Sequence, residues 1–135
     1  MYNTIEHAAS VELLVEDVDD VALFPETLLA LRGVLSDANG GTPVTHEVAI
    51  EGPDLQGLLV EWVNELVRLA EDDGFVPERI DKERLEEGSF RARVAGERGL
   101  PADRIRRLEC RSVGLRQLAD GAWAARVKLD APASA

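Results

Sequence analysis

The sequence predicts an α+β protein in which two helices pack on one face of a mixed five- to six-stranded sheet. Two observations carry this prediction. Residues 52–74 repeat apolar side chains at intervals of three and four, as one face of an amphipathic helix does. Elsewhere, short segments alternate apolar and polar residues, as strands with one buried face do. Both patterns leave one apolar face per segment, so we expect the segments to share one core.

The first half of the chain begins with a strand and a helix. Alternating apolar residues predict a strand over residues 10–16. A repeat with helical spacing then runs from Asp19 or Asp20 to about Leu35. It contains Pro25, which a helix tolerates only near its start, so we expect this helix to kink or to begin late.

The main helix follows a second strand, which we predict over residues 44–50. Asp54 places a carboxylate at the positive end of the helix dipole, and Gly74 supplies a left-handed cap at the other end. The apolar face of this helix includes Trp62. A helix with so wide an apolar stripe must lie on another layer of the protein.

The second half of the chain is predicted to contain only strands. The predicted segments are residues 75–86 as a charged edge strand, then 90–94, 108–118 and 123–130. Asp120 and Gly121 give the hairpin signal between the last two strands. Residues 96–107 are predicted to be a basic loop, which is either solvated or in contact with an acidic partner or RNA.

The length and composition are those of an ordinary globular protein. We predict one domain over residues 1–135, large enough to bury a core without disulfides. Hydrophobic residues make up 45% and charged residues 30%, which gives no sign of disorder. No apolar run approaches the length of a membrane span, and the N-terminus lacks the pattern of a signal peptide. We therefore expect a cytoplasmic protein that does not contact membranes.

Charge and the rarest residues limit the possible functions. The net charge is −11, which repels a phosphate backbone unless basic residues cluster locally, so we expect no direct nucleic-acid binding. The lone Cys110 excludes an internal disulfide and a multi-cysteine zinc site, and we expect it to be a buried strand residue. His46 falls on the apolar face of its strand, where a hydrogen-bonded core histidine is the simpler interpretation and a catalytic one the alternative.

The usual catalytic signatures are missing from the sequence. It has no Gly-rich phosphate loop, no nucleophile elbow and no local pairing of Cys with His, so we expect no enzymatic activity. A hydrolase that uses His7 or His46 is kept as an alternative. Three adjacent acidic pairs are formal candidates for acid/base chemistry, but solvated surface charge explains them better. These pairs are Asp19/Asp20, Asp72/Asp73 and Glu86/Glu87.

A short stretch near the N-terminus groups polar side chains of several kinds. Glu6, His7 and Ser10 stand close together just before a predicted strand. A hard divalent cation needs several oxygen ligands, and Asp130 joins this group only if the first and last predicted strands meet at that end. The residues alone leave open whether a metal site forms here.

The same stretch resembles the Glu-His-Thr-Ala-Asp motif that opens the first strand of archeases, with Ser10 at the place of the final Asp. Residues 54–66 are similar to the family's Asp-Leu-x-x-Leu-Leu-x-x-Trp-Leu-x-Glu-Leu helix, including Trp62. Residues 123–131 are similar to its closing pattern, a Trp followed shortly by Asp-Ile. The match spans nearly the whole chain, which is identified as a divergent member of the archease family.

The resemblance implies an accessory function. Archeases stimulate guanylylation of the RtcB-type RNA-splicing ligase and keep it turning over in tRNA splicing and RNA repair, so such a ligase is the implied partner. The implied ligands of a calcium or magnesium ion are Ser10, Asp130 and the backbone carbonyl of Ala131. Glu6 and His7 at the same end are the implied partner-binding residues.

Two departures from the family pattern bear on this function. Ser10 replaces a carboxylate with a neutral hydroxyl, so we expect divalent metal binding to be weak or lost. The family's Lys-Ala-Val-Thr-Tyr-His strand becomes Arg-Ser-Val-Gly-Leu-Arg at residues 111–116. These changes keep open an alternative, a diverged protein-binding module with the archease fold, a degraded metal site and an unrelated partner.

Overall fold

The computed structural model describes residues 2–6, 10–35, 42–98 and 108–130. Its elements, in chain order, are β1 (Tyr2–Glu6), β2 (Ser10–Asp17), α1 (Leu23–Leu35), β3 (Thr42–Glu51), α2 (Leu55–Asp73), β4 (Phe75–Glu86), β5 (Ser89–Arg98), β6 (Glu109–Gln117) and β7 (Trp123–Asp130). The α+β class and the two helices agree with the sequence prediction. No helix in the described part of the chain is long and apolar enough to cross a membrane.

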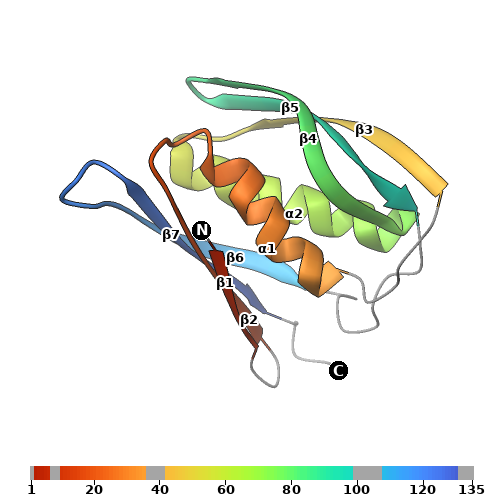
Figure 1. The fold of residues 1–135 in the computed structure, drawn as a ribbon, viewed down its shortest axis with the longest axis horizontal. Coiled ribbons are helices and arrows are strands. Elements are labelled where there is room, and N and C mark those ends of the chain that lie inside the picture. The colour runs from red at the N-terminus through yellow and green to blue at the C-terminus, as the bar shows by residue number, and fades with distance from the viewer. Residues whose placement is uncertain (1, 7–9, 36–41, 99–107, 131–135) are drawn as a thin grey trace.

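The described strands form two sheets, which differs from the single mixed sheet of five to six strands that the sequence predicts. One sheet has the order β1-β2-β7-β6 and the other β3-β5-β4, and all five described pairings are antiparallel. Both helices lie between the two sheets and contact each of them (Figure 1). Alternation along a strand shows which of its faces is buried but not which strands share a sheet, so this division has no local sequence signal.

Two local features also differ from the prediction. β1 was not predicted, because this edge strand leaves Tyr2 and Ile5 exposed and shows no apolar alternation. Residues 96–98 belong to β5 instead of the predicted basic loop, and residues 99–107 of that loop lie outside the described residues. The predicted edge position of β4 is confirmed.

The two ends of α2 and the late start of α1 agree with the sequence prediction. The Asp54 side chain accepts a hydrogen bond from the amide of Gly57 at 2.8 Å, and Gly74 ends α2 with φ of 65°. α1 begins late, at Leu23, so that Pro25 lies in its first turn. An N–H in that turn has no partner within the helix, so the proline breaks no helical hydrogen bond.

Trp62 joins the helices to the three-stranded sheet at the centre of the core. Its side chain is fully buried, and its indole Nε1 donates a hydrogen bond to the carbonyl of Phe24 in α1 at 3.0 Å. The rings of Phe24 and of Phe90 in β5 lie edge-on to it, with centroids 6.0 and 5.2 Å away. One side chain of α2 therefore contacts α1 and β5 together.

We expect Trp62→Ala to lower the free energy of unfolding by about 3–5 kcal/mol, because it removes a large buried ring and leaves a cavity. Urea denaturation of the variant and the wild type measures this difference. Glu61→Ala, at an exposed position of the same helix, is the control and should change stability by less than about 0.5 kcal/mol. Equal stabilities of the two variants would contradict the central position of Trp62.

Candidate functional site

One end of the four-stranded sheet gathers the residues that the sequence analysis assigns to metal and partner binding. Ser10 begins β2 and stands directly opposite Asp130 at the end of β7. The first and last predicted strands therefore do meet at this end, as a shared site requires. Glu6 ends β1 at the same end of the sheet (Figure 1). His7, Ala131 and the side chain of Glu6 lie outside the described residues.

The side chains of Ser10 and Asp130 lie on the outer face of this sheet. Their chain neighbours Val11 and Leu129 are buried in the core, and successive side chains of a strand point to opposite faces. Ser10 and Asp130 are both half-buried. Directly paired residues of an antiparallel sheet have Cβ atoms about 4.5–5.5 Å apart, so the hydroxyl and the carboxylate share one small surface.

Glu109 adds a second carboxylate to this surface, and the sequence analysis missed it. It is exposed and stands opposite Asp130 across the β6–β7 pairing. If β6 and β7 paired regularly from their hairpin turn onward, Cys110 would stand opposite Asp130. A register shift between Cys110 and Ser112 instead puts Glu109 opposite Asp130. Because the sequence does not mark this shift, the position of Glu109 follows only from the structure. We name Ser10, Glu109 and Asp130 the sheet-end site.

Asn64 of α2 holds the backbone of β6 beside this register shift. Its Nδ2 donates a hydrogen bond to the carbonyl of Cys110 at 3.1 Å, and its Oδ1 accepts one from the Cys110 amide at 2.8 Å. Gln56, also on α2, donates a hydrogen bond to the carbonyl of Val113. β6 is an edge strand, so its outer backbone groups need partners that are not strands. The main helix thereby fixes the strand that carries Glu109.

Cys110 is buried behind the sheet-end site, as predicted, with 2% of its surface exposed. The pKa of its thiol is raised to about 11, chiefly by burial and to a smaller extent by the carboxylates of Asp130 and Glu109. Such a thiol stays protonated at neutral pH. Cys110 is therefore a core residue and not a ready nucleophile or metal ligand.

His46 lies on the other sheet, in a cluster of its own. Its Nε2 is 3.0 Å from Oδ2 of Asp73, and its ring is edge-on to that of Phe75 with centroids 4.5 Å apart. Arg98 donates two hydrogen bonds to the same carboxylate, at 3.1 and 3.0 Å. Arg98, and then His46, hold the pKa of Asp73 below its usual value. His46 is thus the partly buried, hydrogen-bonded histidine that the sequence analysis favours.

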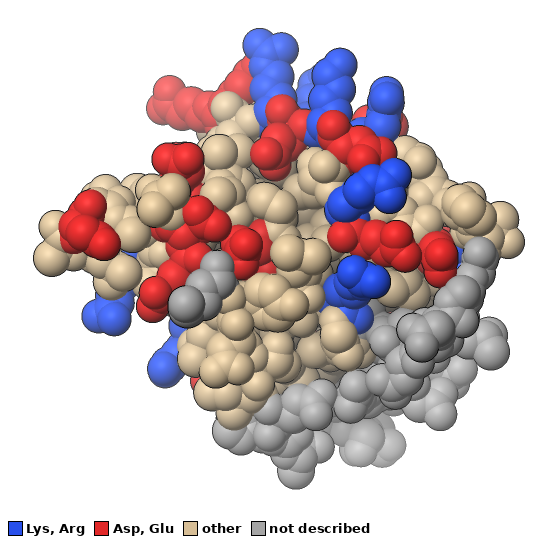
Figure 2. Space-filling view, viewed as in Figure 1, with Lys and Arg blue, Asp and Glu red and all other residues tan. Residues whose placement is uncertain are grey.

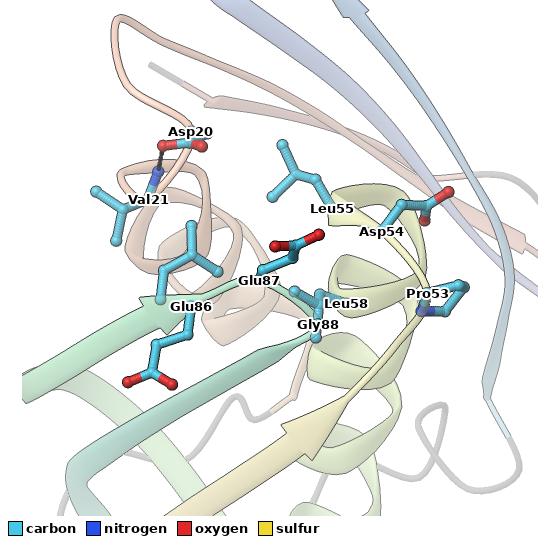
Figure 3. Close-up of a pocket in the computed structure, with 10 residues that line it drawn as sticks. Asp20, Val21, Pro53, Asp54, Leu55, Leu58, Glu86, Glu87 and Gly88 are labelled. Carbon is cyan, nitrogen blue, oxygen red and sulfur yellow. Dashed lines mark hydrogen bonds between the residues drawn. The ribbon is translucent and has the colours of Figure 1, made fainter.

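A separate hollow of about 710 Å³ opens at the N-terminal ends of the two helices (Figure 3). Its lining residues are Asp20, Val21, Pro53, Asp54, Leu55, Leu58, Leu85, Glu86, Glu87 and Gly88. Asp20 accepts a hydrogen bond from the following amide, Asp54 caps α2, and Glu86 forms an ion pair with Arg84. Three of the four carboxylates in the lining thus have local partners within the protein. We therefore interpret them as structural groups near the helix ends and not as a ligand site.

The sheet-end site offers oxygen donors of the kind that calcium and magnesium prefer, two carboxylates and a hydroxyl. No three Asp, Glu, His or Cys side chains come together as a metal site in the described ranges of the chain. The donor types suit a hard cation, but only two of these donors are charged, because Ser10 stands where the family motif has an Asp.

Comparisons with known proteins show the family of this chain. The profile of the Archease protein family matches residues 2–130. The chain belongs to the archease family. It is 34% identical over 139 residues to the "Protein archease" of Methanosarcina acetivorans, covering 96% of this chain and 94% of that relative. The "Protein archease" of Methanosarcina mazei is 34% identical over 140 residues with the same coverage. The resemblance stated from the motif residues is thus confirmed.

A solved structure shows the same fold. The solution structure of Methanobacterium thermoautotrophicum protein 1598 matches with a TM-score of 0.65 and 19% sequence identity. The match covers 96% of this chain and 97% of that one, so the shared fold extends over nearly all of both proteins. The archease fold therefore supplies the frame on which the sheet-end site is built.

We expect Asn64→Ala to destabilise the protein by about 1–3 kcal/mol, because the amide and the carbonyl of Cys110 lose their partner. Urea denaturation measures the loss, and amide hydrogen exchange should become faster in β6. Asn3→Ala is the matched control, since Asn3 is exposed and its side chain accepts a hydrogen bond only from the next amide in the described structure. If Asn64→Ala costs no more than Asn3→Ala, α2 does not hold β6 in this way.

Proposed function

We propose that this protein is an accessory factor of an RtcB-type RNA-splicing ligase. It would stimulate guanylylation and turnover of the ligase in tRNA splicing or RNA repair. Membership of the archease family supports this proposal. The observation that carries it is the meeting of Ser10, Glu109 and Asp130 at one end of a sheet, beside the end of the strand that contains Glu6.

The sheet-end site has the charge and exposure that such contact needs. Glu109 is exposed and Asp130 is half-buried, so the site presents carboxylates at the tip of the molecule. Carboxylates at a tip are complementary to a partner site that holds a divalent cation and a nucleotide. Glu6 and His7, which precede Ser10, would contact the ligase beside that site.

The alternative, a protein-binding module with an unrelated partner, is favoured by a different feature of the same sheet. A hollow of about 560 Å³ lies over the strand that departs from the family pattern, and Gly114 and Arg116 are among its lining residues. A methyl group at Gly114 would meet only the Cβ of Arg126, at 3.9 Å, so this glycine leaves space open. Such space suits a side chain of a partner other than the ligase.

A ligation assay with this protein titrated under multiple-turnover conditions tests the proposal. We expect the wild type to raise the number of ligations per ligase, and Asp130→Ala to lose most of that effect by removing a tip carboxylate. Asp72→Ala, which removes the same charge from an exposed position on α2, should stimulate as the wild type does. A folded wild type that stimulates at no stoichiometry would instead favour the unrelated partner.

For the metal, we propose weak or no binding of calcium or magnesium by the wild type. Ser10→Asp restores the missing charge beside Asp130 and should produce measurable binding in titration calorimetry. Ser112→Asp adds the same charge elsewhere on the outer face and should produce none. Tight binding by the wild type that Asp130→Ala abolishes would show that a hydroxyl suffices at this position.

A further inference from the structure

Four cationic side chains stand together on the outer face of the three-stranded sheet. Lys82 and Arg84 belong to β4, and Arg91 and Arg93 belong to β5. The pairing of these strands sets Arg91 opposite Arg84 and Arg93 opposite Lys82. We name these residues the basic strip. Figure 2 shows Lys and Arg side chains, with acidic ones among them, along the edge of the molecule where Figure 1 places β4 and β5.

The core side of these strands shows that the basic strip faces outward. Ala92, between Arg91 and Arg93, is buried, so its two neighbours point away from the core. Glu83, between the two cations of β4, pairs with Ala92 and therefore belongs to the opposite face. Glu83 thus does not interrupt the row of cations on the outer face, and Asp81, which precedes Lys82, forms an ion pair with Arg79.

Carboxylates of the protein pair with two of the four cations of the strip and leave the other two unpaired. Glu47 accepts a hydrogen bond from Arg93 at 2.7 Å, and Glu86 forms an ion pair with Arg84. In the described ranges of the chain, Lys82 and Arg91 have no ion-pair partner. Like charges directly opposite across a sheet are destabilising, and a negatively charged ligand would relieve the repulsion that Glu47 and Glu86 leave at Lys82 and Arg91.

The spacing of the strip suits a ligand with repeated negative charges. Side chains two residues apart on one strand are separated by about 7 Å, and those directly opposite by about 5 Å. A hollow of about 400 Å³ is lined by the four cations together with Glu47, Glu83 and Ala92. A chain of phosphates meets several of these cations at once, whereas a single anion meets only one or two. The lining of the hollow contains no aromatic side chain on which bases would stack.

We propose that the basic strip binds the phosphate backbone of RNA, without preference for base sequence. The net charge of −11 argues against nucleic-acid binding unless basic residues cluster locally, and here they do. The choice of RNA rests on the proposed function with an RNA ligase. The strip and the sheet-end site lie on different sheets, on opposite sides of the helices, so RNA and ligase have separate surfaces.

Fluorescence anisotropy of a labelled oligouridylate, titrated with the protein alone at several salt concentrations, tests the strip. The double variant Lys82→Ser, Arg91→Thr removes its two unpaired cations. We expect about tenfold weaker binding, and a slope of log affinity against log salt that is reduced by about two. Arg116→Thr, Lys128→Ser removes the same charge from the outer face of the other sheet and should bind as the wild type does.

Three results would overturn the inference. The first is a wild type that does not bind the oligouridylate at low salt. The second is equal loss of binding in both double variants, which would indicate net charge alone. The third is competition by polyglutamate as effective as that by RNA, which would indicate an acidic protein segment as ligand. Melting temperatures of both variants show whether they fold.

The same variants separate this inference from the proposed function. If the Lys82, Arg91 double variant loses RNA binding but still stimulates ligation, the strip binds RNA without serving the ligase. If the wild type binds RNA through the strip but stimulates no ligation, the inference about the strip is supported and the proposed function is contradicted. RNA binding without ligase is therefore the decisive measurement for the strip.

Discussion

The burial of Trp62 between two sheets is the constraint on which the rest of the structure depends. Its ring contacts those of Phe24 and Phe90, and its indole N–H is satisfied by a helix carbonyl, so this large side chain has no unpaired polar atom. The same helix then extends Asn64 and Gln56 toward the other sheet. α2 therefore holds both sheets in place. It contacts the three-stranded sheet through apolar packing, and it contacts the four-stranded sheet through hydrogen bonds to the edge strand β6.

The elements that the sequence predicts best are those with local signals. Asp54 and Gly74 mark the ends of α2 because capping depends on one or two residues, and Pro25 marks the late start of α1 for the same reason. The division into two sheets depends on which strands pair across long stretches of chain, and no single residue records that choice. β1 was missed because an edge strand with exposed Tyr2 and Ile5 needs no apolar alternation.

The sheet-end site shows the same limit at the level of single residues. The pairing of Ser10 with Asp130 could be anticipated, because the family resemblance names both residues as ligands of one metal ion. The structure places them opposite each other. Glu109 could not, since one shifted residue in β6 exchanges Cys110 for Glu109 opposite Asp130. The shift also puts the thiol in the core, where its pKa is about 11, and the carboxylate in solvent. A single irregularity thus decides which side chain lies on the outer surface at this end of the sheet.

Side chains of like charge group locally in this molecule, although the chain as a whole is acidic. A net charge of −11 spread evenly would oppose both a phosphate backbone and an acidic partner. Carboxylates instead meet at the end of the four-stranded sheet, while Lys82, Arg84, Arg91 and Arg93 share the outer face of the other. At physiological salt, charges on opposite sides of the helix layer are separated by more than the Debye length of about 8 Å, so the potential at each surface is set mainly by its own side chains. The charges that group on one surface therefore say more about its ligand than the net charge of the whole chain does.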